Sequence, residues 1–521
     1  MRSTDPNKII DHFYDKHVKK TAKEVYEQSI LIAINLQQMG IKKGDPVIFY
    51  SQNNEWIAVL LGGCILCGAV PLFFECHLDE ESTAIVFDVV QPVAIFYEDK
   101  YRNKIEECLK RRKHQQKPPH LISIDSEENQ PNVKSDMLKQ PEQPIDFASY
   151  KSVKIDDTKD EIALLALTSG STGPPKVVQL SHAHVMHGAT IWWDNAENWE
   201  HLNENSVVFT FSPLRWITQI QLMLQAVLFG VRRVSSSIAL GKHGLELMRN
   251  SGLTHIFASP TFYYDILLLL DENDTESFST LRNIMLGGET PSKVVYELSK
   301  KHAVNAKHYY GYGMTEMASV ICCDMKINGG KLLPGYELQI LDDQWQPLGV
   351  NQPGQIALRP PLPLKGYKSM DNSVYYNDRG LFVNGDYGFM DEEGKLHVLA
   401  RYKDVIKSHG EVIVPNTLEA ILPDSIPEIY IARLVGYHKT PNDPNQIGAW
   451  FVVLHPNVTL SQAEISKKVM DTLKFHLTPA QFAIIQDVHI IDAMPVTYCG
   501  KLDRLALRKL AATKSYNVFI S

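Results

Sequence analysis

The nine residues from Thr168 to Lys176, Thr-Ser-Gly-Ser-Thr-Gly-Pro-Pro-Lys, limit the possible folds of this chain more than any other stretch. They combine hydroxyls, glycines and one cation, which is the chemistry of a loop that wraps a polyphosphate. The apolar runs 162–167 and 176–180 on either side are typical of buried strands. A flexible linker is the alternative, but linkers seldom lie between two apolar strands. The sequence therefore predicts a phosphate-binding loop between two strands.

This loop differs from the P-loop of nucleotide-binding proteins. A P-loop needs the sequence Gly-Lys-Ser/Thr at the start of a helix. Here Pro174 and Pro175 separate Gly173 from Lys176, and the residues after Lys176 are expected to form a strand. The loop therefore belongs to another kind of phosphate site.

Strand and helix patterns alternate along the N-terminal part of the chain. A helical pattern over 20–40 ends at Gly40 and precedes a strand at 46–50. The stretch 113–160 is rich in polar residues and is expected to be mostly a surface excursion. Further strands are predicted at 93–97, 207–211, 255–258 and 283–286, and further helices at 101–112 and 217–229. Such alternation predicts a parallel α/β fold.

Several of the predicted strands end in residues suited to a binding site. Ser212-Pro213, Ser259-Pro260, Gly287-Gly288 and Tyr310-Gly311 stand at these ends. Because ligands bind at the carboxyl ends of strands in open α/β sheets, we expect these residues to lie around one site. Trp216 follows one of them, and it either lines that site or packs in the core.

Composition excludes some classes of function. The chain of 521 residues carries a formal charge of −8 and no basic block, which argues against a nucleic-acid partner. Its seven cysteines are few and mostly in apolar settings, so reduced thiols and a cytoplasmic location are predicted. A peroxisomal location is the alternative, although the chain ends in Phe519-Ile520-Ser521 and not in the Ser-Lys-Leu signal.

The segment 56–74 is uncharged and long enough to span a membrane. Gly62-Gly63, Gly68 and Pro71 interrupt it. A buried helix followed by a buried strand is therefore predicted in place of a transmembrane segment. Cys64 and Cys67 in this segment are expected to be core thiols and not a redox pair.

The loop resembles the phosphate-binding motif of the adenylate-forming superfamily, which includes acyl- and aryl-CoA synthetases and insect luciferases. Four later stretches resemble further motifs of this superfamily in the same order. They are Tyr310 to Glu316 (second nucleotide motif), Gly385-Asp386 (ribose motif), Arg401 to Lys407 (hinge motif) and Gly500 to Asp503 (catalytic lysine motif). The resemblance runs from about residue 20 to about residue 510.

The resemblance implies an α/β fold with two domains. The first, 1–400, is a large AMP-binding domain with stacked sheets and a β-rich part at about 335–399. The second, 401–521, is a small mobile α/β lid with its hinge near Lys403. The strands that usually open such folds are expected to be missing, because the chain is short before the helix at 20–40.

The resemblance also assigns roles to residues. Lys176 and the loop hydroxyls hold the β- and γ-phosphates, Thr315 binds the α-phosphate, and Glu316 with Thr168 binds Mg²⁺. Asp386 binds the ribose hydroxyls with support from Arg401, and Tyr312 packs on adenine. The catalytic residues are Lys501, Thr315, Glu316 and Lys407. The residues expected to bind ATP or coenzyme A are Thr168, Ser169, Gly170, Ser171, Thr172, Gly173, Lys176, Gly288, Glu289, Tyr310, Gly311, Tyr312, Asp386, Arg401 and Gly410.

The function that follows from the resemblance is that of an ATP-dependent acyl-CoA synthetase. It forms an acyl-adenylate and then an acyl-CoA thioester from a carboxylic acid, with ATP, Mg²⁺ and coenzyme A. Two alternatives stay open: a luciferase-like monooxygenase that acts on an adenylated acid, and a nucleotide-binding pseudoenzyme. The partners expected are these small molecules, and the identity of the acid and the oligomeric state are not predicted.

Overall fold

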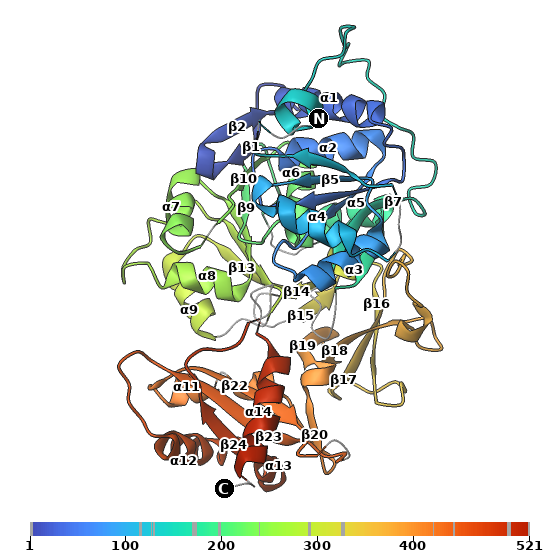
Figure 1. Ribbon diagram of the computed structural model, residues 1–521. Coiled ribbons are helices and arrows are strands. Elements are labelled where there is room, and N and C mark those ends of the chain that lie inside the picture. The colour runs from blue at the N-terminus through green and yellow to red at the C-terminus, as the bar shows by residue number, and fades with distance from the viewer. Residues whose placement is uncertain are drawn as a thin grey trace. The chain divides into compact units, whose positions relative to one another are not determined.

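The computed structural model describes residues 4–113, 117–126, 128, 131–168, 175–195, 200–238, 240–289, 293–324, 329–419, 421–440, 443–496 and 502–518. The chain forms two compact units (Figure 1). The first comprises residues 1–336 and 360–374, and the second comprises residues 337–359 and 375–521. The domain boundary near Arg401 and the hinge at Lys403 stay predictions.

The first unit contains two sheets. One runs in the order β15-β14-β13-β12-β11-β9-β10-β1-β2 and the other in the order β6-β5-β3-β4-β7-β8. The strands of the first sheet are β1 (Ile9–Phe13), β2 (Val18–Thr21), β9 (Val207–Thr210), β10 (Arg232–Ser235), β11 (His255–Ala258), β12 (Asn283–Gly287), β13 (Lys307–Met314), β14 (Ser319–Asp324) and β15 (Gly329–Leu332). Those of the second are β3 (Pro46–Tyr50), β4 (Val70–Phe73), β5 (Ala94–Tyr97), β6 (His120–Ser123), β7 (Ile162–Leu167) and β8 (Val177–Ser181).

Nine helices are described in this unit: α1 (Ala22–Gln38), α2 (Ile57–Cys67), α3 (Glu80–Val90), α4 (Arg102–Lys110), α5 (His182–Asn195), α6 (Ile217–Phe229), α7 (Gly241–Ser251), α8 (Pro260–Leu267) and α9 (Lys293–His302). Apolar side chains of α7, α8 and α9 pack with those of β9, β11 and β12 in one buried cluster, which includes Phe209, Ile256 and Ile284. In Figure 1 these three helices lie together beside β13. The predicted parallel α/β fold is confirmed.

Local sequence explains where these elements begin and end. Helix α1 begins at Thr21, whose hydroxyl accepts from the amide of Glu24 while the Glu24 carboxylate accepts from the amide of Thr21. This reciprocal pair satisfies two backbone donors at the helix start. The uncharged segment 56–74 forms α2 and the buried strand β4, as predicted, with Gly68 in the left-handed conformation between them. Among the described residues, no helix is long and apolar enough to cross a membrane.

Two strands precede the first helix, contrary to the expectation that none would. Strand β1 pairs in parallel with β10, and β2 pairs with β1. The prediction failed because β1 buries polar residues and does not read as an apolar strand. Asp11 pairs with Arg233 across the strands at 3.3 Å, and both side chains are buried. The ion pair makes the burial of each charge tolerable.

The stretch 113–160 also holds more structure than expected. Strand β6 pairs in parallel with β5 at the edge of the second sheet. Further on, Val133 and Met137 are buried, and the backbone oxygen of Met137 accepts from the side chain of Asn35 in α1. The stretch 113–160 is therefore not only a surface excursion, because β6, Val133 and Met137 pack against the rest of the first unit.

The second unit is built from three groups of paired strands and five described helices. Its strands are β16 (Glu337–Leu341), β17 (Gly354–Arg359), β18 (Phe382–Met390), β19 (Lys395–Arg401), β20 (Ile406–Ser408), β21 (Glu411–Ile413), β22 (Ile429–Tyr437), β23 (Ile447–Leu454) and β24 (Ile485–Ile490). Its helices are α10 (Pro415–Glu419), α11 (Ile421–Ser425), α12 (Gln462–Leu473), α13 (Pro479–Ile484) and α14 (Arg504–Val518). Trp450, at the centre of β23, is fully buried in the core of this unit.

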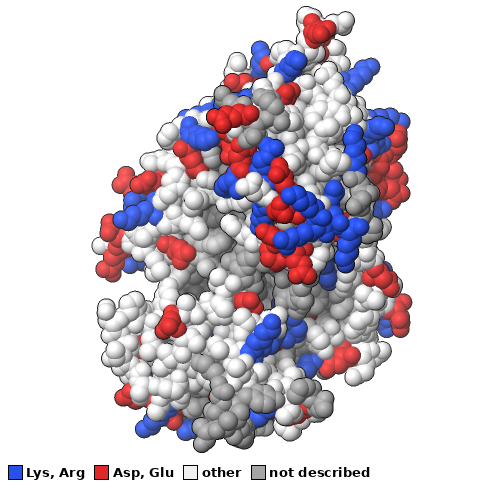
Figure 2. Space-filling view, viewed as in Figure 1, with Lys and Arg blue, Asp and Glu red and all other residues white. Residues whose placement is uncertain are grey.

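Charges of both signs are intermingled on the face shown in Figure 2. Helix α4 illustrates the pattern, since two of its basic residues pair with nearby acids. Arg102 contacts Glu106 at 3.0 Å, and Lys110 contacts Glu107 at 2.6 Å. These exposed pairs contribute little stability, but they neutralise Arg102 and Lys110.

Candidate functional site

The two ends of the predicted phosphate loop are held together by the backbone. Strands β7 and β8 are antiparallel neighbours, and the loop joins them. The amide of Thr168 donates to the carbonyl of Lys176 at 3.0 Å, and the amide of Lys176 donates to the Thr168 hydroxyl at 3.1 Å. The strand–loop–strand prediction is therefore correct at both ends. Ser169, Gly170, Ser171, Thr172 and Gly173 lie outside the described residues, and their roles stay predictions.

Lys176 and Glu316, which are 140 positions apart in the sequence, share one neighbour. The ammonium group of Lys176 lies 4.7 Å from the ring centre of Tyr367, and the hydroxyl of Tyr367 donates to Oε1 of Glu316 at 2.6 Å. Tyr367 is buried and forms an isolated bridge with Val178 of β8. The structure thus brings the predicted loop lysine and the predicted metal ligand to a single tyrosine.

Sequence analysis did not identify Tyr367. The only local signal is a Gly366-Tyr367 pair after the proline-rich stretch 360–363, within a region predicted to be rich in turns. Its position depends on two long-range contacts. The amide of Gln179 in β8 donates to the carbonyl of Gly366 at 3.0 Å, and the amide of Lys368 donates to the carbonyl of Val177 at 2.8 Å.

The predicted metal ligands, Glu316 and Thr168, suit a Mg²⁺ ion that is bound to the phosphates of a substrate. Mg²⁺ usually takes one or two carboxylates and completes its shell with water and substrate phosphate oxygens. Glu316 supplies a carboxylate and Thr168 a hydroxyl, so the residues present fit such an ion. Among the described residues, no group of three or more His, Cys, Asp or Glu side chains could hold a metal without a substrate.

Strand β13 and the turn after it carry the second predicted nucleotide motif. Thr315 and Glu316 lie in a short 3₁₀ turn directly after β13. The ring of Tyr310 is buried in the apolar cluster around Ile284, and burial raises the pKa of its hydroxyl. Tyr312 is also buried. Gly311 allows close packing, because a Cβ there would lie 2.7 Å from the sulfur of Met285.

The carboxyl ends of β9, β11, β12 and β13 lie along one edge of the first sheet, since these strands are parallel neighbours. Gly288 follows β12 with a φ of +86°. The Glu289 carboxylate accepts from the amide of Thr261 at 2.9 Å, at the start of α8. Trp216 is half-buried at the start of α6 and stacks near Phe262 with a centroid separation of 6.2 Å. The residues after β9, β11 and β12 therefore lie close together, as predicted.

The predicted ribose residues are neighbours in the second unit. Asp386 in β18 and Arg401 in β19 are register partners, and Nη1 of Arg401 lies 3.0 Å from Oδ1 of Asp386. The Asp386 side chain is 8% exposed, whereas that of Arg401 is 53% exposed. The pair therefore presents one buried carboxylate that is oriented by a solvent-facing cation.

Lys407, predicted to be catalytic, and Gly410, predicted to bind ATP or coenzyme A, lie on the β20–β21 hairpin of the same unit. Lys407 in β20 contacts Oδ1 of Asp343 at 2.5 Å and the hydroxyl of Tyr402 at 3.1 Å. Burial opposes its charge, but these two hydrogen bonds raise the pKa of Lys407. Gly410 stands in the turn between β20 and β21 with a φ of +80°, and no atom lies within 4 Å of the place that a Cβ would take. Lys501 lies outside the described residues.

The first unit combines a parallel α/β sheet, whose carboxyl edge carries predicted binding residues, with a strand–loop–strand whose lysine shares Tyr367 with Glu316. This arrangement suits a nucleotide-binding α/β enzyme. Residues 3–368 match the family described as AMP-binding enzyme, and the chain belongs to this family. The predicted membership of the adenylate-forming superfamily is therefore confirmed. Relatives named CoA ligases support the predicted class of enzyme, an AMP-forming acid–thiol ligase.

Relatives match the chain over nearly its whole length. It is 25% identical over 518 residues to 2-succinylbenzoate–CoA ligase of Geobacillus sp. (strain WCH70), covering 95% of this chain and 94% of the relative. It is 26% identical over 516 residues to luciferin 4-monooxygenase of Photinus pyralis, covering 96% and 90%. The ATP-bound structure of MatB from Rhodopseudomonas palustris shares the fold with a TM-score of 0.82 at 20% identity, covering 98% and 96%.

Proposed function

We propose that the protein is an ATP-dependent acyl-CoA synthetase that converts a carboxylic acid to its CoA thioester. The observation that carries the proposal is the meeting of Lys176 and Glu316 at Tyr367. A cation for the outer phosphates and a carboxylate for their Mg²⁺ are both needed wherever pyrophosphate leaves. In a protein that does not bind a polyphosphate, Lys176 and Glu316 would be expected to be solvated side chains.

In the proposed first half-reaction, a carboxylate oxygen of the acid attacks the α-phosphorus of ATP, and pyrophosphate leaves. Lys176 and the loop hydroxyls bind the β- and γ-phosphates, and Thr315 donates to the α-phosphate. Lys501 bridges the acid and the α-phosphate and so draws charge off both. Glu316 and Thr168 would hold Mg²⁺, which would neutralise charge on the leaving pyrophosphate.

Asp386 positions the nucleotide in both half-reactions. Its carboxylate accepts from the two ribose hydroxyls as charge-assisted bonds, and Arg401, 3.0 Å away, orients the carboxylate. In the proposed second half-reaction, the thiol sulfur of coenzyme A attacks the acyl carbon and AMP leaves. Lys407 and Gly410 serve this step, since the absence of a side chain at Gly410 leaves room for the pantetheine arm.

A luciferase-like monooxygenase is the second candidate, favoured by the 26% identity to luciferin 4-monooxygenase. Such an enzyme makes an adenylate as well but then oxidises it. The pseudoenzyme alternative rested on missing opening strands, and β1 and β2 remove that support.

One set of assays separates these candidates. The purified protein is given ATP, Mg²⁺ and a panel of carboxylic acids of graded chain length and aromaticity, and pyrophosphate release is measured with and without coenzyme A. We expect release with at least one acid, with consumption of the CoA thiol in equal amount. Light emission with luciferin and no thiol consumption would favour the monooxygenase. No pyrophosphate release with any acid would contradict both.

A further inference from the structure

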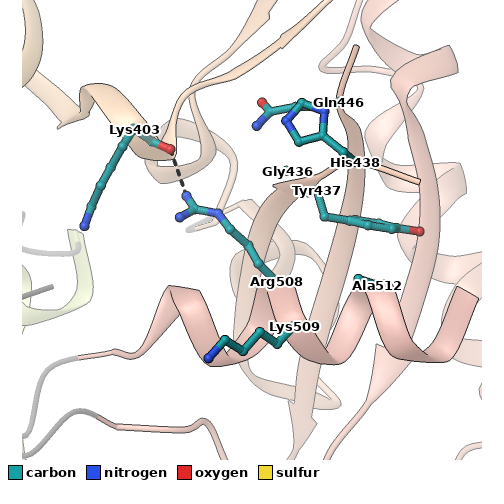
Figure 3. A pocket seen from close by; sticks show the side chains of 8 residues that line it. All are labelled: Lys403, Gly436, Tyr437, His438, Gln446, Arg508, Lys509 and Ala512. Atoms are coloured by element: carbon teal, nitrogen blue, oxygen red, sulfur yellow. Dashed lines mark hydrogen bonds between the residues drawn. The ribbon is translucent and has the colours of Figure 1, made fainter. Parts of the chain in front are cut away.

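A cavity of about 360 Å³ lies within the second unit, and neither Asp386 nor Arg401 of the proposed ribose site lines it. It is open, and it is lined by strand β22 and its following residues, by helix α14 and by Lys403 (Figure 3). Its lining residues are Lys403, Gly436, Tyr437, His438, Gln446, Arg508, Lys509 and Ala512. Gly436 and Ala512 add little bulk, so the walls leave space between the polar side chains.

Three of the lining residues are cations. Lys403 and Arg508 are adjacent, with the Arg508 guanidinium group bonded to the backbone of Lys403, and Lys509 follows Arg508 on α14 (Figure 3). Burial lowers the pKa of Lys403; the charges of Arg508 and Arg401 lower it further, while Asp404 opposes the shift. Among the described residues two acids act on this group: Asp404, which is shared between Arg508 at 2.5 Å and Arg504 at 3.7 Å, and Asp503, whose charge acts on Lys403. Positive charge is therefore in excess around the cavity.

Arg508 is anchored through one edge of its guanidinium group. Its Nη2 donates to the carbonyl of Lys403 at 2.9 Å and to Oδ1 of Asp404 at 2.5 Å. Within the described part of the chain these are its hydrogen bonds, so Nε and Nη1 have no partner there. The side chain is only 21% exposed. The guanidinium group is mostly buried, and two of its nitrogens, Nε and Nη1, are available to bind an anion through two hydrogen bonds.

Other donors face the same space. Gln446 uses its Oε1 to accept from the amide of Lys407 at 3.1 Å, which leaves its amide nitrogen without a partner among the described residues. Lys509 is exposed and forms no ion pair within the described ranges. The hydroxyl of Tyr437 donates to Asp487 instead, and its ring points away from Arg508 (Figure 3).

We propose that this cavity, defined by Arg508, Lys509, Lys403 and Gln446, binds the phosphate group of a small phosphorylated ligand. Phosphate fits better than carboxylate, because its oxygens diverge and can meet a guanidinium edge, an ammonium and an amide from different directions. The cavity is larger than one anion requires, so it accepts a second phosphate or an attached group. The inference goes beyond the proposed adenylation, and no residue of the site proposed for that reaction lines the cavity.

The site has a structural link to the predicted hinge. Arg508 donates a hydrogen bond to the backbone carbonyl of Lys403. An anion bound to the other edge of the guanidinium group would therefore restrain the side chain that contacts Lys403. A bound phosphate would therefore stiffen the 3₁₀ turn Tyr402–Asp404 against α14. The expected effect is regulation of movement at Lys403 by a phosphorylated metabolite.

The test is hydrogen exchange of the full-length protein, read by mass spectrometry, during titration with inorganic pyrophosphate. Orthophosphate, sulfate and AMP form parallel arms, all at one ionic strength set with sodium chloride. We expect pyrophosphate to slow exchange in peptides that cover 400–408, 436–446 and 504–512. Protection by AMP at the same peptides, and none by pyrophosphate, identifies a nucleotide phosphate as the ligand and still supports the site. Equal protection by sodium chloride alone overturns it.

Variants locate the ligand. Arg508→Gln should weaken the pyrophosphate effect about tenfold and the exposed Lys509→Gln about threefold, whereas Lys467→Gln on α12 should not change it. Lys509→Gln keeps the proposal testable if Arg508→Gln does not fold. Lys176→Ala should leave this protection intact, even though it impairs the proposed adenylation. Loss of protection in Lys176→Ala, together with retention in both Arg508→Gln and Lys509→Gln, would place the anion in the first unit and overturn the inference.

Discussion

The hydroxyl of Tyr367 donates a hydrogen bond of 2.6 Å to Oε1 of Glu316. The ring that carries this hydroxyl also lies under the ammonium group of Lys176. Tyr367 therefore fixes two groups of opposite charge at one place, without allowing them to neutralise each other in a direct ion pair. A polyphosphate with its metal needs both charges.

Tyr367→Phe should test this arrangement, because it removes the hydroxyl and keeps the ring. A hydrogen bond to a charged group contributes about 1.5–3 kcal/mol. We expect the adenylation rate to fall about tenfold or more, and more Mg²⁺ to be required, because Glu316 loses its orienting partner. ATP–pyrophosphate exchange over a range of Mg²⁺ concentrations measures both. Tyr336→Phe, at a buried tyrosine elsewhere in the unit, is the control, and an unchanged Mg²⁺ dependence in Tyr367→Phe would contradict the role.

Lys176→Ala should weaken ATP binding and adenylation together. The variant loses a phosphate counter-charge and the cation–π contact with Tyr367, on the order of 1–3 kcal/mol in all. Calorimetric titration with ATP and the exchange assay give the two values. Lys159→Ala, at an exposed lysine in the same unit, should match the wild type. If Lys176→Ala keeps its ATP affinity and rate, the loop assignment is wrong.

Asp386→Ala should cost about 2–3 kcal/mol of nucleotide binding, because a pair of charge-assisted hydrogen bonds is lost. Arg401 is half-exposed, so water can solvate it in the variant and little further destabilisation is expected. ATP that lacks both ribose hydroxyls should bind the wild type and the variant alike. A variant that still prefers intact ribose would show that other residues bind it.

The two half-reactions should separate in variants of the C-terminal region. Lys501→Ala should abolish adenylate formation but still convert supplied acyl-adenylate to the thioester. Gly410→Leu should release pyrophosphate in the first turnover and form little thioester, and Lys403→Pro should behave like Gly410→Leu if it freezes the hinge in the adenylating arrangement. Single-turnover assays of each half-reaction on folded protein measure these outcomes.

Gly410 needs a matched control, because its φ of +80° strains any other residue regardless of the active site. Gly394 has a φ of +73° in a hairpin turn of the same unit, and like Gly410 it has no atom near a potential Cβ. Gly394→Leu should therefore reproduce the backbone strain but keep thioester formation. Equal loss of both half-reactions in Lys501→Ala and Gly410→Leu would count against a mobile lid that supplies Lys501 for adenylation and Gly410 for thioester formation.

Acid should destabilise the first unit through His12. Burial, together with the charges of Lys19 and Arg232, lowers the pKa of His12 to about 4. The unfolded chain has a histidine pKa near 6.5, so between pH 6.5 and 4 it binds a proton that the folded protein does not. Stability should fall over this range by on the order of 2–3 kcal/mol. Thermal unfolding at pH 7.5 and 5 should show a smaller drop for His12→Phe than for the exposed control His476→Phe.

Much of the α/β framework was predictable, because its signals are local. Strands such as β3 and β9 are continuous apolar runs, and α6 matches its predicted span from residue 217 to 229. The loop motif identified the neighbourhood of Thr168 and Lys176 from composition alone. Such elements bury apolar side chains whatever their distant partners are.

The unpredicted parts depend on partners far along the chain. Asp11 is an unfavourable strand residue until Arg233 lies beside it, and no local pattern reveals that pairing. Tyr367 acquires its role only when the backbone at 366–368 bonds to β8. The Glu289 carboxylate accepts from the amide of Thr261 in the first turn of α8, a contact that no local pattern indicates. Local periodicity carries no information about such pairings.

The pairing of β1 with β10 has a consequence for the order in which the protein is made. β1 ends at residue 13 and its parallel partner begins at residue 232, so the first strand leaves the ribosome long before its partner exists. At synthesis rates of about 5–20 residues per second, the wait is on the order of 10–40 s. Asp11 and His12 are polar residues buried in the finished sheet, and we expect them to oppose aggregation of this segment during translation.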